Sequence, residues 1–319
     1  MRALQQTALT GPSAMRLITD APVPAPGRGE VLIRVGAAGV NFADVMQTRG
    51  RYDGGPRAPY IAGFEAAGEV VAIGPGVTGL EPGAHVIGTG PGAFAEYVVL
   101  PAAGAAPVPA GWSDEASLGL VLNWATALAA LRLGRLAAGE TVLVQAAAGG
   151  VGQAAVRLAR HRGATVIGTA SPDKHDVVRA LGADHVLDYR NADVQRLTEG
   201  RGADLVLESA GGDAFRAGLA ATRRVTGRLV VYGMAGGEAT ISNRDLNFTH
   251  PVHVIGLHIR ILSEAAPDLF AELMAELAAL IAAGVYPPGQ PTVHDLADGP
   301  TVLAALEARA TVGKLALRP

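Results

Sequence analysis

A glycine-rich segment between two regular elements is the part of this sequence with the clearest chemistry. Residues 141–159 read TVLVQAAAGGVGQAAVRLA, where an apolar strand pattern runs into Gly149, Gly150 and Gly152 and then into a helix pattern. Bare glycine backbone lets a pyrophosphate approach, and free N–H groups at a helix N-terminus attract its charge. Compared with G-x-G-x-x-G, Ala147 replaces the first glycine. A helix start without a ligand is the alternative, but the surrounding strand–helix alternation favours dinucleotide binding.

The end of the next predicted strand indicates which dinucleotide is bound. An NAD site usually has Asp or Glu about 20 residues after the turn, where it accepts hydrogen bonds from the ribose 2′-hydroxyl. Here residues 168–174 read GTASPDK, so Ser171 and Lys174 occupy the region of the expected acid, and Tyr189 and Arg190 end the following strand. A hydroxyl together with a cation suits a 2′-phosphate, and the sequence therefore predicts NADPH.

Two residues of this segment also have ordinary structural explanations. Asp173 stands where a helix cap or a first-turn acid is unremarkable. Lys174 is equally compatible with a solvated helix position, because lysine side chains are mostly exposed without any function.

Composition excludes several other classes of protein. The 319 residues are 49% hydrophobic and 17% charged, which rules out disorder and favours two domains. The net charge of −3 and the 4% aromatic content give no support for nucleic-acid or membrane-surface binding. The chain contains no cysteine, which excludes disulfides, thiolate chemistry, iron–sulfur clusters and cysteine-ligated zinc.

The sequence favours neither export nor insertion in a membrane. The first residues, MRALQQTALTGPSAMRL, lack the apolar core of a signal peptide. The uncharged stretch from Ala116 to Leu131 has 16 residues, which is short for a membrane span. It contains Asn123 and Thr126, and we interpret it as a helix buried in a soluble core. A cytoplasmic protein is therefore expected.

The pattern of elements changes near residue 116. Before it, short apolar runs such as VLIRV (31–35) and GEVVAIG (68–74) are separated by glycine and proline, which predicts a β-rich barrel or sandwich. After it, strands alternate with helices as far as RLVVYG (228–233), which predicts an α/β domain with a parallel, doubly wound sheet. VHVIGLHI (252–259) is expected to add an edge strand, and one helix is predicted from about 264 to 283.

Several motifs in order resemble one family. AAAGGVGQ, GTASPDK and LGADHVLDY are similar to the medium-chain dehydrogenase/reductase superfamily, and specifically to its zinc-free quinone reductase and zeta-crystallin branch. GVNFADVMQTRGRY (39–52), AGFEAAGEV (62–70), GAFAEYVVLP (92–101) and the C-terminal VGKLALRP extend the resemblance over the whole chain. It implies a Rossmann domain at 119–254, inserted in a GroES-like catalytic domain that begins at 1–118 and is completed by 255–319.

The resemblance also bears on metal. Zinc-dependent relatives have a cysteine ligand near Asn41 and a histidine ligand just before Glu65, where this chain has Asn41 and Phe64. We therefore expect no metal site. His250, His253 and His258 form a close cluster without an acid, and we interpret them as packing or interface residues.

Two residues are candidates for catalysis on the basis of the resemblance. Asn41 in the family faces the nicotinamide ribose, although Asn41 and Asp44 also fit a helix capping box. Tyr52 matches a tyrosine that lines the family's substrate cleft, and it is the candidate hydrogen-bond donor; an exposed loop tyrosine is the alternative. The full predicted cofactor set comprises Asn41, Thr126, Ala148, Gly149, Gly150, Val151, Gly152, Ser171, Lys174, Tyr189, Ser209, Tyr232 and Gly233.

The predicted function is NADPH-dependent hydride transfer to a quinone or a conjugated enone without a metal, because such acceptors delocalise charge themselves. Reduction of 2-enoyl thioesters is an alternative, for which Arg49, Arg51 and Arg57 would supply a basic surface. A non-catalytic NADPH-binding scaffold or sensor is a third. A homodimer through the edge strand is expected.

Overall fold

The chain folds into two compact units. The computed structural model describes residues 1–319 and divides them into Met1–Val121 with Pro287–Pro319, and Leu122–Tyr286. We describe each unit by itself. The domain boundaries expected from the sequence, 1–118, 119–254 and 255–319, stay a prediction. When the chain is divided by its internal contacts, the helices between residues 259 and 282 lie in the second unit.

The first unit is built mainly from antiparallel strands. A three-stranded sheet has the order β2 (Met15–Ile18), β1 (Ala3–Gln6), β4 (Tyr60–Ile61). A larger sheet has the order β15-β16-β3-β5-β6-β8, and β7 also pairs with β3. The bounds of its strands are β3 Glu30–Val40, β5 Glu65–Ile73, β6 His85–Thr89, β7 Tyr97–Pro101, β8 Ala106–Pro107, β15 Thr292–Asp295 and β16 Leu315–Arg318.

The C-terminal segment completes this first unit. β16 pairs antiparallel with the end of β3, so that Leu315 lies opposite Val40. Helix α1 (Phe42–Thr48) starts directly after β3, and helix α10 (Gly299–Glu307) packs against it. The core between the sheets is apolar and mostly aliphatic, with Leu4, Ile33 and Leu303 fully buried beside the aromatic Phe94. The β-rich first domain predicted from the sequence is confirmed.

The second unit is a parallel sheet of six strands. Its order is β11 (His185–Asp188), β10 (Thr165–Ala170), β9 (Thr141–Val144), β12 (Leu205–Glu208), β13 (Arg228–Val231), β14 (His253–Gly256). All neighbouring strands are parallel, so every strand ends at the same edge. The order reverses at β9, which is the topological switch point of a doubly wound sheet. The predicted fold class is confirmed.

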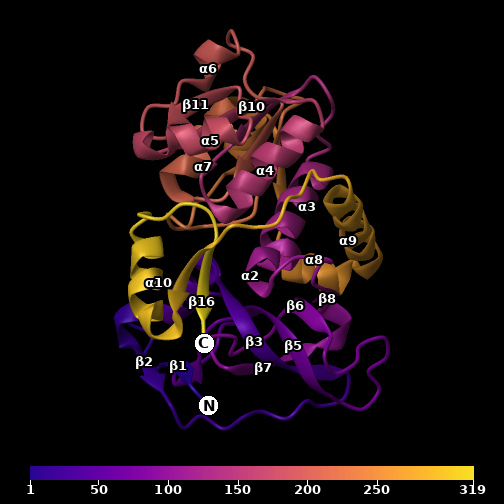
Figure 1. Ribbon diagram of the computed structural model, residues 1–319. Helices are drawn as coiled ribbons and strands as arrows, with labels where there is room; N and C mark the ends of the chain where they lie inside the picture. Colours follow the sequence, from indigo (N-terminus) through magenta and orange to yellow (C-terminus); the bar gives the residue numbers. More distant parts are fainter. The chain divides into compact units, whose positions relative to one another are not determined.

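Helices surround this sheet (Figure 1). Helix α4 (Gly150–His161) packs on β9 and β10, α5 (His175–Ala180) on β10 and β11, and α7 (Gly212–Ala221) on β12; the short α6 spans Val194–Leu197. β14 is the predicted edge strand, but it stops at Gly256 because helix α8 (Ile259–Ala265) begins soon after. The helix predicted from 264 to 283 is α9, Pro267–Ala282. It starts later than predicted because helical structure is interrupted at Ala266, the residue before the proline.

The uncharged stretch near residue 116 forms consecutive helical elements. These are α2 (Asp114–Ser117), the π-helical turn η3 (Leu120–Trp124) and α3 (Ala125–Leu133). By length and composition alone, Asp114–Leu133 is long and apolar enough to cross a membrane, and it exceeds the 16 residues counted in the sequence. However, 67% of its apolar window is buried inside the protein, as in the core helix of a water-soluble fold.

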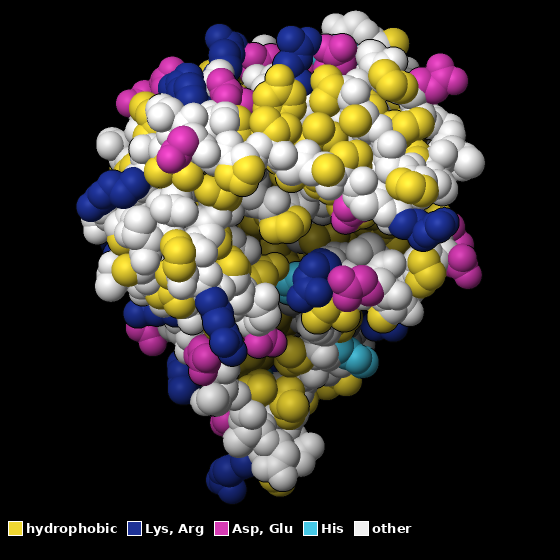
Figure 2. All heavy atoms as spheres, turned by 90° about the horizontal axis from the view of Figure 1, so that it is seen from below, with side chains coloured by type: hydrophobic (Ala, Val, Ile, Leu, Met, Phe, Trp, Pro, Cys, Tyr) yellow, Lys and Arg dark blue, Asp and Glu magenta, His cyan; other side chains and the backbone are white.

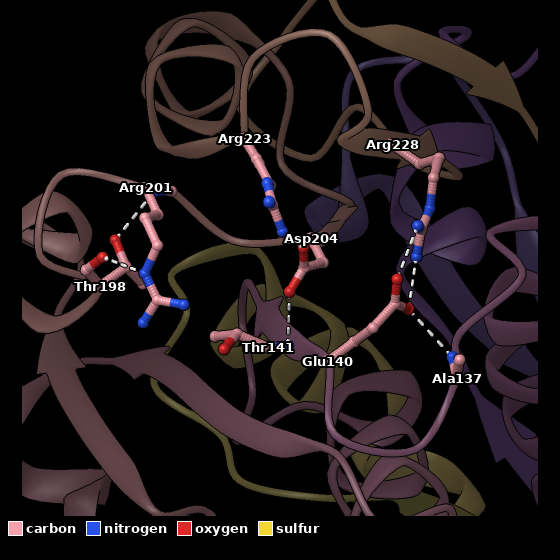
Figure 3. A network of polar contacts seen from close by, with 9 residues as sticks. Ala137, Glu140, Thr141, Thr198, Arg201, Asp204, Arg223 and Arg228 are labelled. Carbon is pink, nitrogen blue, oxygen red and sulfur yellow. Dashed lines mark hydrogen bonds and ion pairs between the residues drawn. The ribbon is translucent and has the colours of Figure 1, made fainter.

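Charged side chains tie together the edge of the six-stranded sheet where the strands begin (Figure 3). Arg228, at the start of β13, donates to both carboxylate oxygens of Glu140 at 2.8 and 2.6 Å. Asp204, just before β12, accepts from the backbone N–H of Thr141 at 3.0 Å and from Arg223 at 2.8 Å. We call this edge the amino-terminal edge. Its three central strands are thus cross-linked by side chains.

The protein surface mixes the two signs of charge. Figure 2 shows basic and acidic side chains interspersed on one face, with no large area of a single sign. The mixture on this face agrees with the small net charge of −3.

Candidate functional site

The glycine-rich turn joins β9 to α4 at the opposite edge of the sheet, which we call the carboxyl edge. Gly149 is the N-cap of α4 with φ −83°, and no side chain caps the helix. The first N–H groups of an α-helix have no partners within the helix, and α4 has three turns of backbone dipole behind them. An anion bound at the N-terminus of α4 therefore meets unpaired donors and the positive end of the dipole.

Two of the three glycines of the turn, Gly152 and Gly149, are glycine for different reasons. A Cβ at Gly152 would lie 2.2 Å from the carbonyl oxygen of Ala146 and 2.7 Å from Cα of Ala147, so packing of helix on strand requires glycine there. A Cβ at Gly149 would meet only one protein atom, at 3.4 Å. Because the protein itself leaves this position open, Gly149 provides space at the helix N-terminus, and the turn fits a pyrophosphate.

The residues expected at the 2′-phosphate gather where β10 and β11 end. Ser171 directly follows β10 and Tyr189 directly follows β11, and the two strands are paired through Ala170 and Asp188. The Ser171 hydroxyl donates to Asp173 and lowers the pKa of that carboxyl, with smaller contributions from Lys174 and Arg190. The site thus contains a hydroxyl, two cations and two acids, Asp173 and Asp188.

Tyr189 is half-exposed, and the guanidinium of Arg190 lies 5.4 Å from the centre of its ring. Arg190 also approaches Asp188, with Nε 3.4 Å from Oδ1. Arg190 thus lies beside the predicted Tyr189, although the sequence indicated it only as a second choice. An aromatic face backed by a guanidinium is a suitable surface for an adenine ring.

Three further predicted residues follow β12 and β13 at the same edge. Ser209 comes directly after β12, and Tyr232 and Gly233 come directly after β13. A Cβ at Gly233 would lie 2.5 Å from the carbonyl oxygen of Ser209, so these two turns touch. Beneath them, Glu208 Oε1 accepts from the N–H groups of Ala210 and Gly211 at 2.7 and 2.6 Å. Burial raises the pKa of Glu208, and burial also raises the pKa of Tyr232.

The remaining predicted residues of the second unit lie around the helix start. Thr126 is buried in the first turn of α3, which packs on α4. Ala148 is buried, and its carbonyl oxygen accepts from Gln153 at 3.0 Å, while Val151 is half-buried on α4. Sequence reasoning missed Asn123: a Cβ at Gly150 would lie 3.1 Å from its Oδ1. Its only sequence signal was a polar residue within an apolar run.

In the first unit, Asn41 belongs to a buried polar network. The capping box with Asp44 is confirmed, since the Asn41 N–H donates to Asp44 Oδ2 at 2.8 Å. The Asn41 amide also donates to Glu65 Oε2 at 2.9 Å and to the Gly39 carbonyl at 3.2 Å, and its Oδ1 accepts from Lys314 Nζ at 2.8 Å. With the capping bond from the Asp44 N–H, the amide protons and the acceptor oxygen are engaged within this unit. Contact of Asn41 with a cofactor stays a prediction.

Glu65 and Lys314 were not assigned any role from the sequence. Glu65 is fully buried and forms an ion pair with Lys314; its other oxygen accepts from the N–H of Gly119 at 2.8 Å. A Cβ at Gly39 would lie 2.2 Å from Glu65 Oε2, so glycine there makes room for the carboxylate. The two residues are 249 positions apart, and nothing in the local sequence pairs them.

Burial shifts two titrations in the same region. It raises the pKa of Asp44 to about 8, with the charge of Glu65 adding to the rise and Asn41 and Lys314 opposing it. It also raises the pKa of Tyr60 to about 12, and the negative charge of Asp44 contributes. Asp44 Oδ1 and the Tyr60 hydroxyl are both buried without a hydrogen-bond partner. Burial thus favours the protonated form of the Asp44 carboxyl.

Tyr52 follows α1 by four residues and is half-buried in a turn closed by a hydrogen bond from the Gly55 N–H to its carbonyl, at 2.9 Å. The three arginines considered as a basic surface are not equivalent. All three are exposed, but only Arg49 is held by Glu307, through two hydrogen bonds of 2.8 Å. A basic surface around Tyr52 is therefore reduced to two arginines.

The side chains suited to a metal do not cluster. No group of three or more His, Cys, Asp or Glu side chains is arranged to hold a metal ion. His253 is exposed on β14, and burial lowers the pKa of His258. The chain thus combines a doubly wound unit that has an uncapped, glycine-rich turn with a β-rich unit that carries Asn41 and Tyr52.

Known proteins share both units. The alcohol dehydrogenase GroES-like domain matches residues 27–110, and the zinc-binding dehydrogenase domain matches residues 150–278. A mycobacterial protein solved in complex with NADPH is 34% identical, with a TM-score of 0.93 over the full length of both chains. The quinone oxidoreductase of Escherichia coli, also complexed with NADPH, is 28% identical, with a TM-score of 0.90 over both full chains.

This protein belongs to the medium-chain dehydrogenase/reductase superfamily, in its zinc-free quinone oxidoreductase branch. A mycocerosic acid synthase-like polyketide synthase of Mycobacterium tuberculosis is 37% identical over 302 residues, which are 92% of this chain and 14% of that protein. The next two curated relatives are also longer, and the matched regions span 61% and 60% of their lengths.

Proposed function

We propose that this protein is an NADPH-dependent oxidoreductase that transfers a hydride to a quinone or a conjugated enone without a metal ion. One observation carries the proposal, and it concerns the carboxyl edge of the sheet. There the start of helix α4 at Gly149 is open and uncapped, and the end of β10 is followed by the hydroxyl of Ser171 and the cation of Lys174, with no acid at the end of the strand itself. Membership of a branch whose structures include NADPH complexes supports it.

Most of the predicted residues have a defined task in this proposal. NADPH supplies the hydride. The backbone N–H groups of residues 149–152 bind its pyrophosphate, and Ser171, Lys174 and Tyr189 hold the 2′-phosphate through charge-assisted hydrogen bonds. Ser209 and Gly233 lie in the two neighbouring turns. The first has only a small hydroxyl side chain and the second has none, so the cofactor can lie along the edge.

The first unit supplies groups for the acceptor. Tyr52 donates a hydrogen bond to the acceptor oxygen, where negative charge develops as the hydride arrives. Asn41 is held rigidly by Glu65 and Lys314 and fixes the start of α1, which leads to Tyr52. A quinone or an enone needs little further polarisation, because conjugation spreads the developing charge over its own atoms.

Assembly and location belong to the same proposal. β14 is an edge strand with Val254 exposed, so it is suited to pairing with a second copy about a two-fold axis. We propose a cytoplasmic homodimer. Light scattering at micromolar concentration should give twice the mass of 32.4 kDa, and a monomer would contradict this part.

A panel assay tests the activity. NADPH and NADH are each offered with benzoquinones, short enones and a crotonyl thioester, and oxidation of the nicotinamide is followed at 340 nm in a protein stripped of metal by chelation. We expect turnover with NADPH and quinones or enones that chelation leaves unchanged. Turnover confined to the thioester favours the enoyl thioester alternative, and NADPH binding without turnover favours a scaffold or sensor.

A further inference from the structure

Helix α1, which separates Asn41 from Tyr52, is held at both ends by the C-terminal segment of the chain. At its start, Lys314, next to β16, donates to the Asn41 side chain. At its end, Arg49 is the C-cap residue and pairs with Glu307, the last residue of α10. The two contacts come from residues more than 250 positions away in sequence.

The contact at the end of α1 has the geometry of a strong ion pair. Arg49 Nε and Nη2 donate to the two oxygens of Glu307, both at 2.8 Å, so the pair is bidentate. Its third nitrogen, Nη1, donates to the Thr10 carbonyl at 2.6 Å. The hydrogen bond from Arg49 holds the pKa of Glu307 below its usual range. A planar guanidinium with three fixed acceptors has one orientation.

The neighbouring backbone is shaped to receive this guanidinium. Gly11 has φ +113°, and a Cβ there would lie 2.4 Å from Arg49 Cζ. The Gly11 N–H donates to the Thr48 carbonyl at 2.9 Å. The segment before β2 therefore covers one side of the arginine, and Glu307 covers another.

From Arg49 the chain runs to Tyr52 through a tight turn. Gly50 has φ +63°, and its N–H donates to the Gln47 carbonyl at 3.0 Å. The Arg51 N–H returns to the Met46 carbonyl at 2.9 Å. Tyr52 follows the fixed arginine by only three positions, and both intervening N–H groups are bonded to α1. A shift of Arg49 is thus transmitted to Tyr52.

We propose that the Arg49–Glu307 ion pair is a positioning device that sets the place of the Tyr52 hydroxyl for the reaction. The inference rests on the proposed function, because it assigns Tyr52 to the acceptor. Arg49 is then a positioning residue, and it is not part of the basic surface considered for 2-enoyl thioester substrates. The pair is partly exposed, with 38% and 33% of the two side chains accessible, so it has little to contribute to global stability.

The test compares graded changes at Arg49 with a matched ion pair elsewhere. Arg49→Met removes the pair, and Arg49→Lys keeps the charge but not the bidentate fork. The control is the double variant Glu115→Gln, Arg318→Met, which removes another arginine–glutamate pair, 2.6 Å long. That pair joins β16 to α2 and does not involve α1. Thermal melting, kcat and KM are measured for each variant, together with hydrogen exchange of the peptide spanning residues 50–55.

We expect kcat with a quinone to fall about tenfold or more in Arg49→Met, because misplacement of a reacting group by about 1 Å has effects of at least this size. Arg49→Lys should fall between Arg49→Met and the wild type. The KM for NADPH and the melting temperature should match those of the control pair. Exchange of residues 50–55 should accelerate in Arg49→Met alone.

A double-mutant comparison tests whether Arg49 acts through Tyr52. In a Tyr52→Phe background, Arg49→Met should produce no further loss of kcat, since the hydroxyl that it positions is gone. Losses that multiply, or a kcat of Arg49→Met equal to that of the control pair, overturn the inference. A wild type with no turnover contradicts the proposed function instead, and unchanged exchange of residues 50–55 then overturns the positioning role separately.

Discussion

The two edges of the six-stranded sheet are built from the same strands and have opposite chemistry. At the amino-terminal edge, Arg228, Glu140 and Asp204 satisfy one another and the backbone N–H of Thr141 (Figure 3). At the carboxyl edge, the turn after β9 is glycine-rich, the start of α4 has no side-chain cap, and a Cβ at Gly149 would meet only one protein atom. Polar groups paired inside the protein stabilise it, whereas polar groups left open are available to a ligand.

The difference explains why binding is expected at only one edge. Strands of a parallel sheet point the free N–H groups of the following helices toward their carboxyl ends, and the reversal of order at β9 opens the space between neighbouring turns there. At the other edge the same strands are joined by ion pairs between Arg228 and Glu140 and between Arg223 and Asp204.

The largest effect is expected from Gly152→Ala at the carboxyl edge. The new Cβ would lie 2.2 Å from the Ala146 carbonyl, so α4 must move away from β9 or the turn must open. We expect NADPH affinity to fall by about a hundredfold, which is about 2.7 kcal/mol, with a lower melting temperature. Gly149→Ala is the control: its Cβ meets one atom at 3.4 Å, so it should melt like the wild type while binding NADPH less tightly. Wild-type affinity in Gly152→Ala contradicts the packing argument.

The next effect is expected at the amino-terminal edge and concerns stability alone. Arg228→Met leaves Glu140 without the partner that it contacts twice, where only 11% of the arginine and 23% of the glutamate side chain are exposed. We expect a loss of about 2 kcal/mol in the free energy of unfolding, with unchanged NADPH affinity. Arg223→Met, in the more exposed pair with Asp204, should cost less. An NADPH dissociation constant raised tenfold in Arg228→Met would break the contrast between the edges.

A smaller effect is expected from Lys174→Ala. Loss of one cation at the 2′-phosphate should weaken NADPH binding about tenfold, or about 1.4 kcal/mol, and leave NADH binding unchanged. Arg179→Ala is a matched control, because Arg179 lies on α5 nearby and pairs with Asp176 on the surface. If Lys174→Ala keeps the preference for NADPH, binding of the 2′-phosphate is assigned to Tyr189, Arg190 or Ser171 instead. Equal affinity of the wild type for NADPH and NADH would refute the 2′-phosphate site.

The smallest effect is a pH dependence of opposite sign at the two edges. The hydrogen bond from Arg228 lowers the pKa of Glu140, so its stabilisation is present above the ordinary glutamate range and is lost as the pH falls through the lowered value. Burial raises the pKa of Glu208, so the folded form binds its proton more tightly and stability declines as the pH rises from the ordinary glutamate range through the raised value.

Melting temperatures across pH 3–8 measure this difference. Glu140→Gln should destabilise the protein most at neutral pH and least in acid. Glu208→Gln keeps an oxygen for the N–H groups of Ala210 and Gly211, and it should gain on the wild type as the pH rises. Parallel curves for the two variants would show that neither carboxyl titrates as described.

The sequence predicted what depends on local pattern. The alternation of strands and helices led to the parallel sheet, the glycine spacing led to the close packing at Gly152, and Asn41 with Asp44 led to the capping box. Each of these depends on residues within about one turn or one strand of each other.

Pairings between distant segments were not visible in the sequence. Lys314 with Glu65, Arg49 with Glu307 and Arg228 with Glu140 join residues between 88 and 258 positions apart. Side chains of these types are normally solvated, so nothing marks one lysine or arginine as paired until the fold brings its partner close. The break at Ala266 between α8 and α9 was missed for a different reason, because the apolar periodicity continues across it.

Hydrogen exchange with and without NADPH tests the central contrast most directly. Peptide-level exchange is measured in the wild type with saturating NADPH, with NADH and with no nucleotide. The account predicts that NADPH protects residues 147–153, 169–175 and 209–212, which follow β9, β10 and β12, and that NADH protects the segment 169–175 less. Residues 137–141, 201–204 and 223–228, at the amino-terminal edge, should exchange as in the free protein. Protection confined to the amino-terminal edge, or none at residues 147–153, would contradict the account.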